Sequence, residues 1–124
     1  MGRPVVHFEI MGSDAARLRS FYSGLFDWSI DAENPMNYGM VDRAANQSAE
    51  GIGIGGGIGA LPEGMGGGHV TVYVEVPDVE AALTTAVSLG GTRLMGPETI
   101  MEGIEIGLLN DPEGHMIGVI KGRS

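Results

Sequence analysis

Two stretches of the chain alternate apolar and polar side chains with the period of a β-strand. In residues 4–11, Val6, Phe8 and Ile10 form an apolar row, whereas His7 and Glu9 lie on the other face. Residues 69–76 repeat the pattern, with valine at every even position. The odd positions of that second stretch are His69, Thr71, Tyr73 and Glu75. The pattern predicts two strands, each with its apolar row packed under a helix.

A helix is expected after each of these strands. Leu18, Phe21, Tyr22 and Leu25 share one helical face, which predicts a helix from about Asp14 to about residue 24. Ser13 or Asp14 can cap its start. The second helix begins after Asp78, where Ala82, Ala86 and Leu89 keep helical spacing, and Gly90-Gly91 ends it.

The remaining segments contain six further strand candidates. The first of them starts at about residue 27, and the other five lie at 38–41, 51–59, 92–95, 104–109 and 116–121. Residues 51–68 hold ten of the 22 glycines, which indicates a strand with one bare face and a bulge, then a connector. Asp111-Pro112-Glu113-Gly114 is a turn between the last two strands.

These elements form an internal repeat of order βαβββ. Superimposing Asp14 on Asp78 aligns the two helical faces, and three strand candidates follow each helix. The prediction is an α+β domain of residues 1–124, with modules at about 1–60 and 69–124 and a linker at 61–68. The two modules are expected to form a curved, partly open eight-stranded sheet around a cavity, with the helices outside.

Composition narrows the class of partner. Seven basic against 16 acidic residues give a net charge of −9, which disfavours nucleic acid and anionic membranes. The chain has no cysteine, so disulfides, cysteine zinc sites and cysteine nucleophiles are excluded. No apolar run reaches the ~20 residues that span a bilayer, and no signal pattern opens the chain. A cytoplasmic location is therefore expected.

The polar rows of the two alternating strands supply the candidate chemistry, since they should face the cavity. His7 and Glu9 are the candidate catalytic residues, because histidine titrates near neutral pH and a carboxylate in a dry cavity can act as an acid or base. A hydrogen-bonding role for His7 stays open. So do two further readings of Glu9 and Glu75: both carboxylates are solvated, or one of them is paired with Arg93 or Arg43. The candidate ligand-binding residues are Tyr38, Thr71, Tyr73 and Glu75.

A set of short motifs spans nearly the whole chain in a characteristic order. They are His7-Phe8-Glu9-Ile10, Asp14, Leu18, Phe21-Tyr22, Leu25-Phe26, Trp28, Val74-Glu75-Val76, Asp78-Val79, Ala82, Leu89-Gly90-Gly91 and Asp111-Pro112-Glu113-Gly114-His115. Their order and spacing resemble the vicinal oxygen chelate superfamily of glyoxalases, bleomycin-resistance proteins and extradiol dioxygenases. The resemblance implies a homodimer that holds a small organic molecule.

Enzymes of the superfamily usually hold a divalent metal on the first and last strands of each module. Carried over by position, the first strands offer His7 and Thr71, or His69 if the register slips by two residues. The last strand of the first module offers only Gly53, Gly55 or Gly57, and that of the second offers Gly118. Because glycine cannot ligate a metal and catalytic sites typically use three protein ligands, we predict that this metal site is absent.

The resulting prediction is a small-molecule-binding protein of glyoxalase or bleomycin-resistance type. No cofactor is expected, although a divalent metal stays open. The alternative is a glyoxalase-like lyase or dioxygenase-like enzyme that acts on a small organic substrate, with His7 and Glu9 transferring protons.

Overall fold

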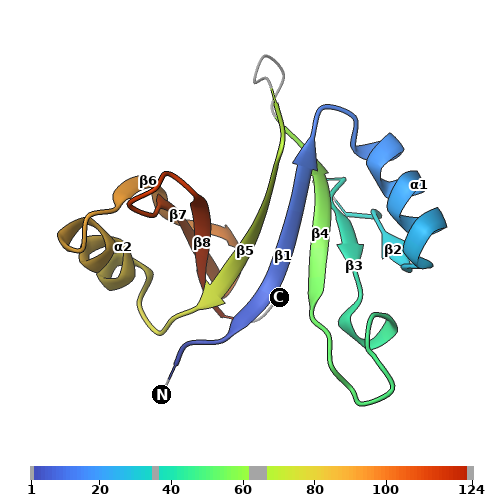
Figure 1. Cartoon of the computed structure of the whole chain (residues 1–124), viewed down its shortest axis with the longest axis horizontal. Helices are drawn as coiled ribbons and strands as arrows, with labels where there is room; N and C mark the ends of the chain where they lie inside the picture. The colour runs from blue at the N-terminus through green and yellow to red at the C-terminus, as the bar shows by residue number, and fades with distance from the viewer. Residues whose placement is uncertain (1, 35–36, 62–66, 123–124) are drawn as a thin grey trace. The chain divides into compact units, whose positions relative to one another are not determined.

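The computed structural model describes residues 2–34, 37–61 and 67–122, which divide into two units. One unit is His7–Val70, and the other combines Met1–Val6 with Thr71–Ser124. Figure 1 labels the helices and strands of each. In the described part of the chain, no helix has the length and apolar character needed to cross a bilayer.

The unit His7–Val70 is a four-stranded sheet with one α-helix. Its strands have the order β2-β3-β4-β1, in which β1 and β4 are parallel and the other neighbours are antiparallel. The elements are β1 (Val5–Gly12), α1 (Ala15–Phe26), β2 (Ile30–Asp31), β3 (Gly39–Val41), the 3-10 helix η1 (Arg43–Ala45) and β4 (Gly55–Ala60).

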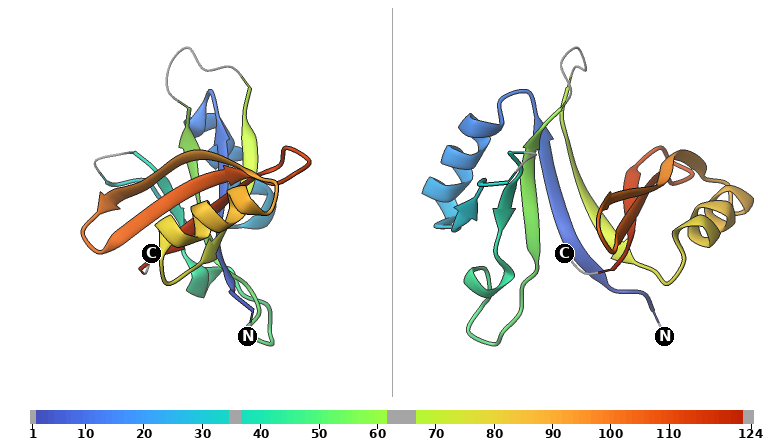
Figure 2. Two further views of the ribbon diagram at one scale, coloured as in Figure 1. Left: turned by 90° about the vertical axis from the view of Figure 1, so that its left-hand side faces the viewer. Right: turned by 180° about the vertical axis from the view of Figure 1, so that it is seen from behind.

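The second unit repeats this topology. Its strand order is β5-β8-β7-β6, with β5 and β8 parallel and the other neighbours antiparallel. The elements are β5 (His69–Glu75), α2 (Val79–Ser88), β6 (Thr92–Met101), β7 (Ile104–Asn110) and β8 (Met116–Lys121). Figure 2 shows the long hairpin of β6 and β7 with α2 beside it. The predicted α+β class and the double βαβββ order are confirmed.

Local signals fix both helix starts. Asp14 Oδ1 accepts from the Arg17 backbone N–H at 3.0 Å, and Asp78 Oδ1 accepts from that of Ala81 at the same distance. The first helix ends two residues later than expected, because the chain stays helical through Gly24. Asp27, in the left-handed conformation with φ 60°, ends it and donates its N–H to the Ser23 carbonyl.

The core of the unit His7–Val70 lies between its sheet and α1. Ile10, Val41 and Ile58 are buried there from three different strands. They are surrounded by Phe8, Leu18, Tyr22, Trp28 and Ile30. The prediction that the apolar row of this strand faces the first helix is therefore confirmed for Phe8 and Ile10. It is wrong for Val6, which belongs to the other unit and packs there against the cluster around Tyr73.

The glycine-rich strand is shorter and more regular than expected. Its ladder starts at Gly55 instead of residue 51, and six consecutive residues pair with β1 without a register shift. The register shifts lie in β6, where they allow a strand of ten residues to follow the seven of β7.

The valine row of β5 does not follow the prediction. Val76 packs against the cluster of Val79, Leu83 and Val119 under α2, but Val70 is 70% exposed. The reason is the strand order: α2 packs on β6, β7 and β8, whereas β5 lies at the end of this unit's sheet.

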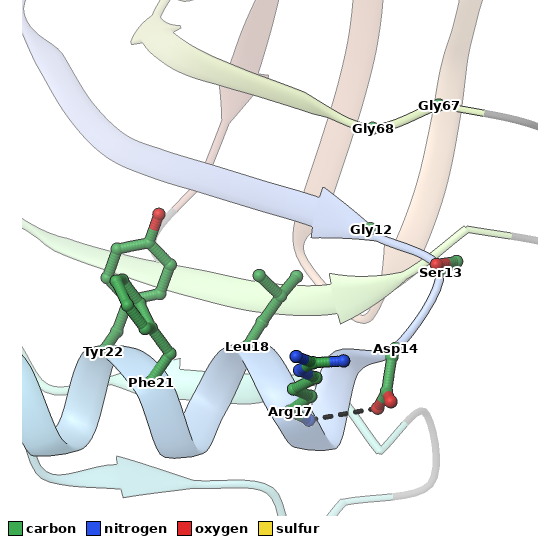
Figure 3. A pocket seen from close by; sticks show the side chains of 9 residues that line it. All are labelled: Gly12, Ser13, Asp14, Arg17, Leu18, Phe21, Tyr22, Gly67 and Gly68. Atoms are coloured by element: carbon green, nitrogen blue, oxygen red, sulfur yellow. Dashed lines mark hydrogen bonds between the residues drawn. The ribbon is translucent and has the colours of Figure 1, made fainter.

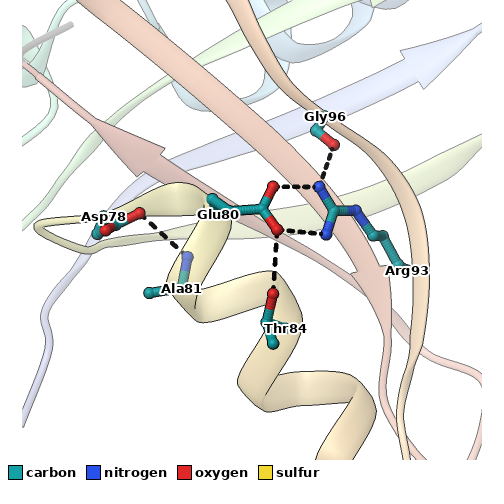
Figure 4. A network of polar contacts seen from close by, with 6 residues as sticks. All are labelled: Asp78, Glu80, Ala81, Thr84, Arg93 and Gly96. Atoms are coloured by element: carbon teal, nitrogen blue, oxygen red, sulfur yellow. Dashed lines mark hydrogen bonds and ion pairs between the residues drawn. The ribbon is translucent and has the colours of Figure 1, made fainter.

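An exposed ion pair joins α2 to β6 (Figure 4). Arg93 contacts both carboxylate oxygens of Glu80, at 2.9 Å and 2.5 Å, and also donates to the Gly96 carbonyl. Thr84 donates to the same carboxylate at 3.0 Å. The hydrogen bonds from Arg93 and then Thr84 lower the pKa of Glu80 from 4.5 to about 2.

Candidate functional site

Three predicted site residues of the unit His7–Val70 meet in one hydrogen-bonded cluster. His7 and Glu9 are alternate residues of β1, and Tyr38 immediately precedes β3. His7 Nε2 lies 3.0 Å from Tyr38 Oη, which donates to Glu9 Oε2 at 2.9 Å. His69 Nε2 lies 3.8 Å from the other oxygen of Glu9. We refer to His7, Tyr38 and Glu9 as the β1 cluster.

The hydrogen bonds of the β1 cluster assign its protons. Because Tyr38 gives its hydroxyl proton to Glu9, the hydroxyl oxygen accepts from His7, which places a proton on Nε2. His7 is only 8% exposed, and this burial lowers its pKa, while the nearby Glu9 carboxylate opposes the shift more weakly. The ring is therefore neutral at neutral pH.

Such a chain can move a proton between a bound molecule and a carboxylate. The Tyr38 hydroxyl donates to Glu9 Oε2 and accepts from His7 Nε2. A proton that Tyr38 passes to Glu9 can therefore be replaced by one from His7. The side chain of Glu9 is 15% exposed and that of His69 is 31% exposed, which leaves part of the cluster accessible.

The side chain of Asn34 holds the backbone of Tyr38, whereas the sequence indicated only a turn at Asn34. Its side-chain Nδ2 donates to the Tyr38 carbonyl at 2.7 Å, and its Oδ1 accepts from the Tyr38 N–H at 3.0 Å. Asn34 precedes Pro35, and asparagine is typical of such local side chain-to-backbone bonds. Spacing alone offered no signal that the clamped residue would reach β1.

Gly57 gives the Tyr38 ring its place. Glu9 lies opposite Gly57 in the parallel ladder of β1 and β4. A Cβ at residue 57 would fall on the ring carbons and hydroxyl of Tyr38, so the ring lies directly over this glycine. The bare face of the glycine-rich strand is thus filled by an aromatic side chain from a neighbouring segment.

The second unit repeats this arrangement by itself. Tyr73 lies opposite Gly118 in the parallel ladder of β5 and β8, and a Cβ at residue 118 would clash with the Tyr73 ring. The offset that aligns Asp14 with Asp78 also aligns Glu9 with Tyr73, so Gly57 and Gly118 are equivalent positions. In both units a tyrosine ring therefore covers a glycine of the last strand, on which enzymes of the superfamily that the sequence resembles usually carry a metal ligand.

The positions that the sequence resemblance assigns to a metal hold His7, Thr71 and glycines. Within residues 2–34, 37–61 and 67–122, no group of three histidine, aspartate or glutamate side chains is arranged to hold a metal. Thr71, the equivalent of His7, is buried and donates its hydroxyl to the Met116 carbonyl at 2.6 Å.

Thr71, Tyr73 and Glu75 belong to the second unit. Tyr73 is buried in an apolar cluster with Ile104, Ile106 and Ile120, which gives its ring a packing role in addition to the predicted ligand contact. The backbone N–H of Glu75 donates to the Pro4 carbonyl at 2.9 Å.

The two arginines considered as partners for one of the carboxylates, Glu9 or Glu75, bind other groups. Arg93 binds Glu80, and Arg43 donates to the Gly53 carbonyl at 3.4 Å. Arg43 lies ten residues from Gly53 in the sequence, and Arg93 lies on β6 beside the helix that carries Glu80. Tyr38 is placed at Glu9 by the pairing of β3 with β4.

Comparison with known proteins decides the family. A model described as "Glyoxalase-like domain" matches residues 7–120. The chain belongs to the glyoxalase-like domain family. The resemblance to the vicinal oxygen chelate superfamily seen in the sequence is thereby confirmed.

Curated relatives of this glyoxalase-like domain are longer than the chain. "Putative glyoxylase CFP32" of Mycobacterium bovis and of Mycobacterium tuberculosis is 27% identical over 115 residues, which cover 90% of this chain and 42% of the relative. The chain therefore spans less than half the length of these relatives.

Solved structures share the fold of this glyoxalase-like domain. A methylmalonyl-CoA epimerase variant from Streptomyces coelicolor has a TM-score of 0.67 and 17% identity, covering 100% of this chain and 99% of that one. The epimerase from Mycobacterium tuberculosis has a TM-score of 0.68 and 13% identity, covering 97% and 88%. At these identities the likeness concerns the fold alone.

Proposed function

We propose that this glyoxalase-like domain binds a small organic molecule at the β1 cluster without using a divalent metal. The observation that carries the proposal is the position of Tyr38. Its ring lies over Gly57, and its hydroxyl bonds both His7 and Glu9. A tyrosine therefore supplies the polar group at a place where a metal-dependent relative would need a ligand.

The chemistry of the cluster suits a ligand with a carbonyl or hydroxyl group. A neutral imidazole, a phenol and a carboxylate together offer donors and acceptors within one hydrogen-bonded chain. Partial burial strengthens such bonds, because water competes less for the same groups. Thr71, Tyr73 and Glu75 remain predicted ligand-binding residues, and the homodimer remains a prediction as well.

Elemental analysis of protein purified without chelator tests the metal-free part. We expect substoichiometric divalent metal and no rise in melting temperature when Zn²⁺, Mn²⁺, Ni²⁺ or Co²⁺ is added, since a ligand that binds only the native state must raise it. Stoichiometric metal that is lost in a His7→Ala variant would contradict the proposal.

A fragment screen by NMR tests the binding part. Fragments with carbonyl or hydroxyl groups should shift the ring signals of His7 and Tyr38. The Tyr38→Phe variant should bind these fragments more weakly, because it removes one hydroxyl while keeping the ring over Gly57. Hits that bind Tyr38→Phe as tightly as the unchanged protein would place the ligand elsewhere.

A second candidate function is metal-independent proton transfer, and the specific observation in its favour is the continuous chain from His7 through Tyr38 to Glu9. It would remove a proton from carbon beside a carbonyl group, with Glu9 as the base. Hydroxyacetone in D₂O is a suitable probe: enzyme-dependent exchange of its C–H groups that disappears in Glu9→Gln supports this function, and exchange unaffected by that substitution contradicts it.

A further inference from the structure

A hollow lies in the unit His7–Val70, beside the first two turns of α1 (Figure 3). Its volume is about 580 Å³, which is within the range of small-molecule sites. The lining residues are Gly12, Ser13, Asp14, Arg17, Leu18, Phe21, Tyr22, Gly67 and Gly68. None of them belongs to the β1 cluster, so the hollow is a separate feature.

Glycine main chain forms one side of this hollow because neighbouring atoms leave no room for side chains. A Cβ at Gly68 would lie 2.5 Å from the Met11 carbonyl oxygen. A Cβ at Gly12 would lie 2.8 Å from Leu18 Cδ1. This side is therefore bare backbone that a flat molecule can approach closely.

An exposed aromatic ring forms the facing wall. Phe21 is 59% exposed, although its ring packs edge-on against Tyr22 with centroids 5.0 Å apart and planes at 89°. Tyr22 is itself fixed by stacking on Trp28, at 5.7 Å and 21°. Phe21 thus presents free aromatic surface in an orientation that the core maintains.

Arg17 supplies the positive charge of the hollow. It lies one helical turn before Phe21, so the two side chains share a face about 5–6 Å apart. Among the residues that the structure describes, its guanidinium has no hydrogen bond or ion pair. The nearby Asp14 carboxylate accepts a hydrogen bond from the backbone N–H of Arg17 at 3.0 Å.

We propose that this hollow binds a planar aromatic carboxylate. The ring of the ligand lies between Phe21 and the backbone of Gly12 and Gly68, and its carboxylate accepts hydrogen bonds from Arg17. The ligand needs both its ring and its carboxylate. The walls of the hollow are apolar and suit the ring, and Arg17 offers one positive charge for one carboxylate. In a chain of net charge −9, an unpaired arginine beside apolar walls distinguishes this place from the acidic surface.

Benzoate and benzyl alcohol are the probes, titrated into ¹⁵N-labelled protein and followed by NMR. Benzoate should shift the amide signals of Gly12, Phe21 and Gly67. Arg17→Gln should weaken benzoate binding about tenfold, as expected for a lost charged hydrogen bond, and leave benzyl alcohol unchanged. Arg3→Gln removes the same charge from an exposed position outside the hollow and should leave both affinities unchanged.

Any one of three results would overturn the proposal. The first is that benzoate causes no shifts around the hollow, or shifts only His7 and Tyr38. The second is an equal loss of affinity in Arg17→Gln and Arg3→Gln, which would reduce the effect to overall charge. Phe21→Ala is a second variant that should weaken both probes, and unchanged binding there would also refute the site. These tests leave the proposed function untouched, since they alter no residue of the β1 cluster.

Discussion

Adding one methyl group at Gly57 should dismantle the β1 cluster. In Gly57→Ala the new Cβ would occupy the space of the Tyr38 ring, which lies directly over this position. Overpacking of this kind costs about 1–3 kcal/mol. Displacing the ring also breaks the hydroxyl bonds to His7 and Glu9, each worth about 0.5–1.5 kcal/mol. The free energy of unfolding should therefore fall by about 2–6 kcal/mol.

Urea denaturation of matched variants measures this loss. Gly24→Ala is the control, because no atom lies within 4 Å of a Cβ there and an alanine inside a helix stabilises by about 0.5–1 kcal/mol. Tyr38→Ala should suppress the effect, so that adding Gly57→Ala to it costs little more. The reasoning is refuted if Gly57→Ala is as stable as the unchanged protein, or if its cost is the same with and without the Tyr38 ring.

Two further predictions concern pH. Burial lowers the pKa of His7 in the folded protein, so the unfolded chain takes up the proton first as the pH falls. The contribution of His7 to stability should therefore be fully present above pH 6.5 and decline below it. Urea unfolding across this range should show a shallower decline in His7→Gln, and an identical one would count against the burial argument. Glu80 has a lowered pKa of about 2, so its pairing with Arg93 should stabilise fully above pH 4.5 and lose its effect as the pH falls toward 2. Thermal unfolding should show that contribution missing in Glu80→Gln, with no added loss when Arg93→Gln is combined with it.

Alternation and helical spacing predicted most of the fold. Both opening strands, both helices and the final strand at 116–121 lie where the pattern placed them, and Asp14 and Asp78 cap the helices as expected. These features are local, since a cap or an alternating row depends on residues within a few positions of one another. The burial of β5 was predicted less well, because it depends on which strands α2 covers.

The sequence indicated the residues of the β1 cluster but not most of the contacts among them. His7, Glu9 and Tyr38 were each named from the sequence, but their bonds depend on β3 and β4 lying beside β1. The spacing of Asn34 carried no signal that it would clamp Tyr38. Alternation placed His69 on the polar row of its strand, but its approach to Glu9 depends on the tertiary structure.

The sequence by itself determined the two βαβββ repeats, because side-chain periodicity and capping act between near neighbours. It also determined that glycine stands at positions 57 and 118, which leaves no ligating side chain there. Only the tertiary structure decided what fills those places. A tyrosine ring covers each glycine because strand pairing brings distant segments together, and in the first unit its hydroxyl then joins an imidazole to a carboxylate.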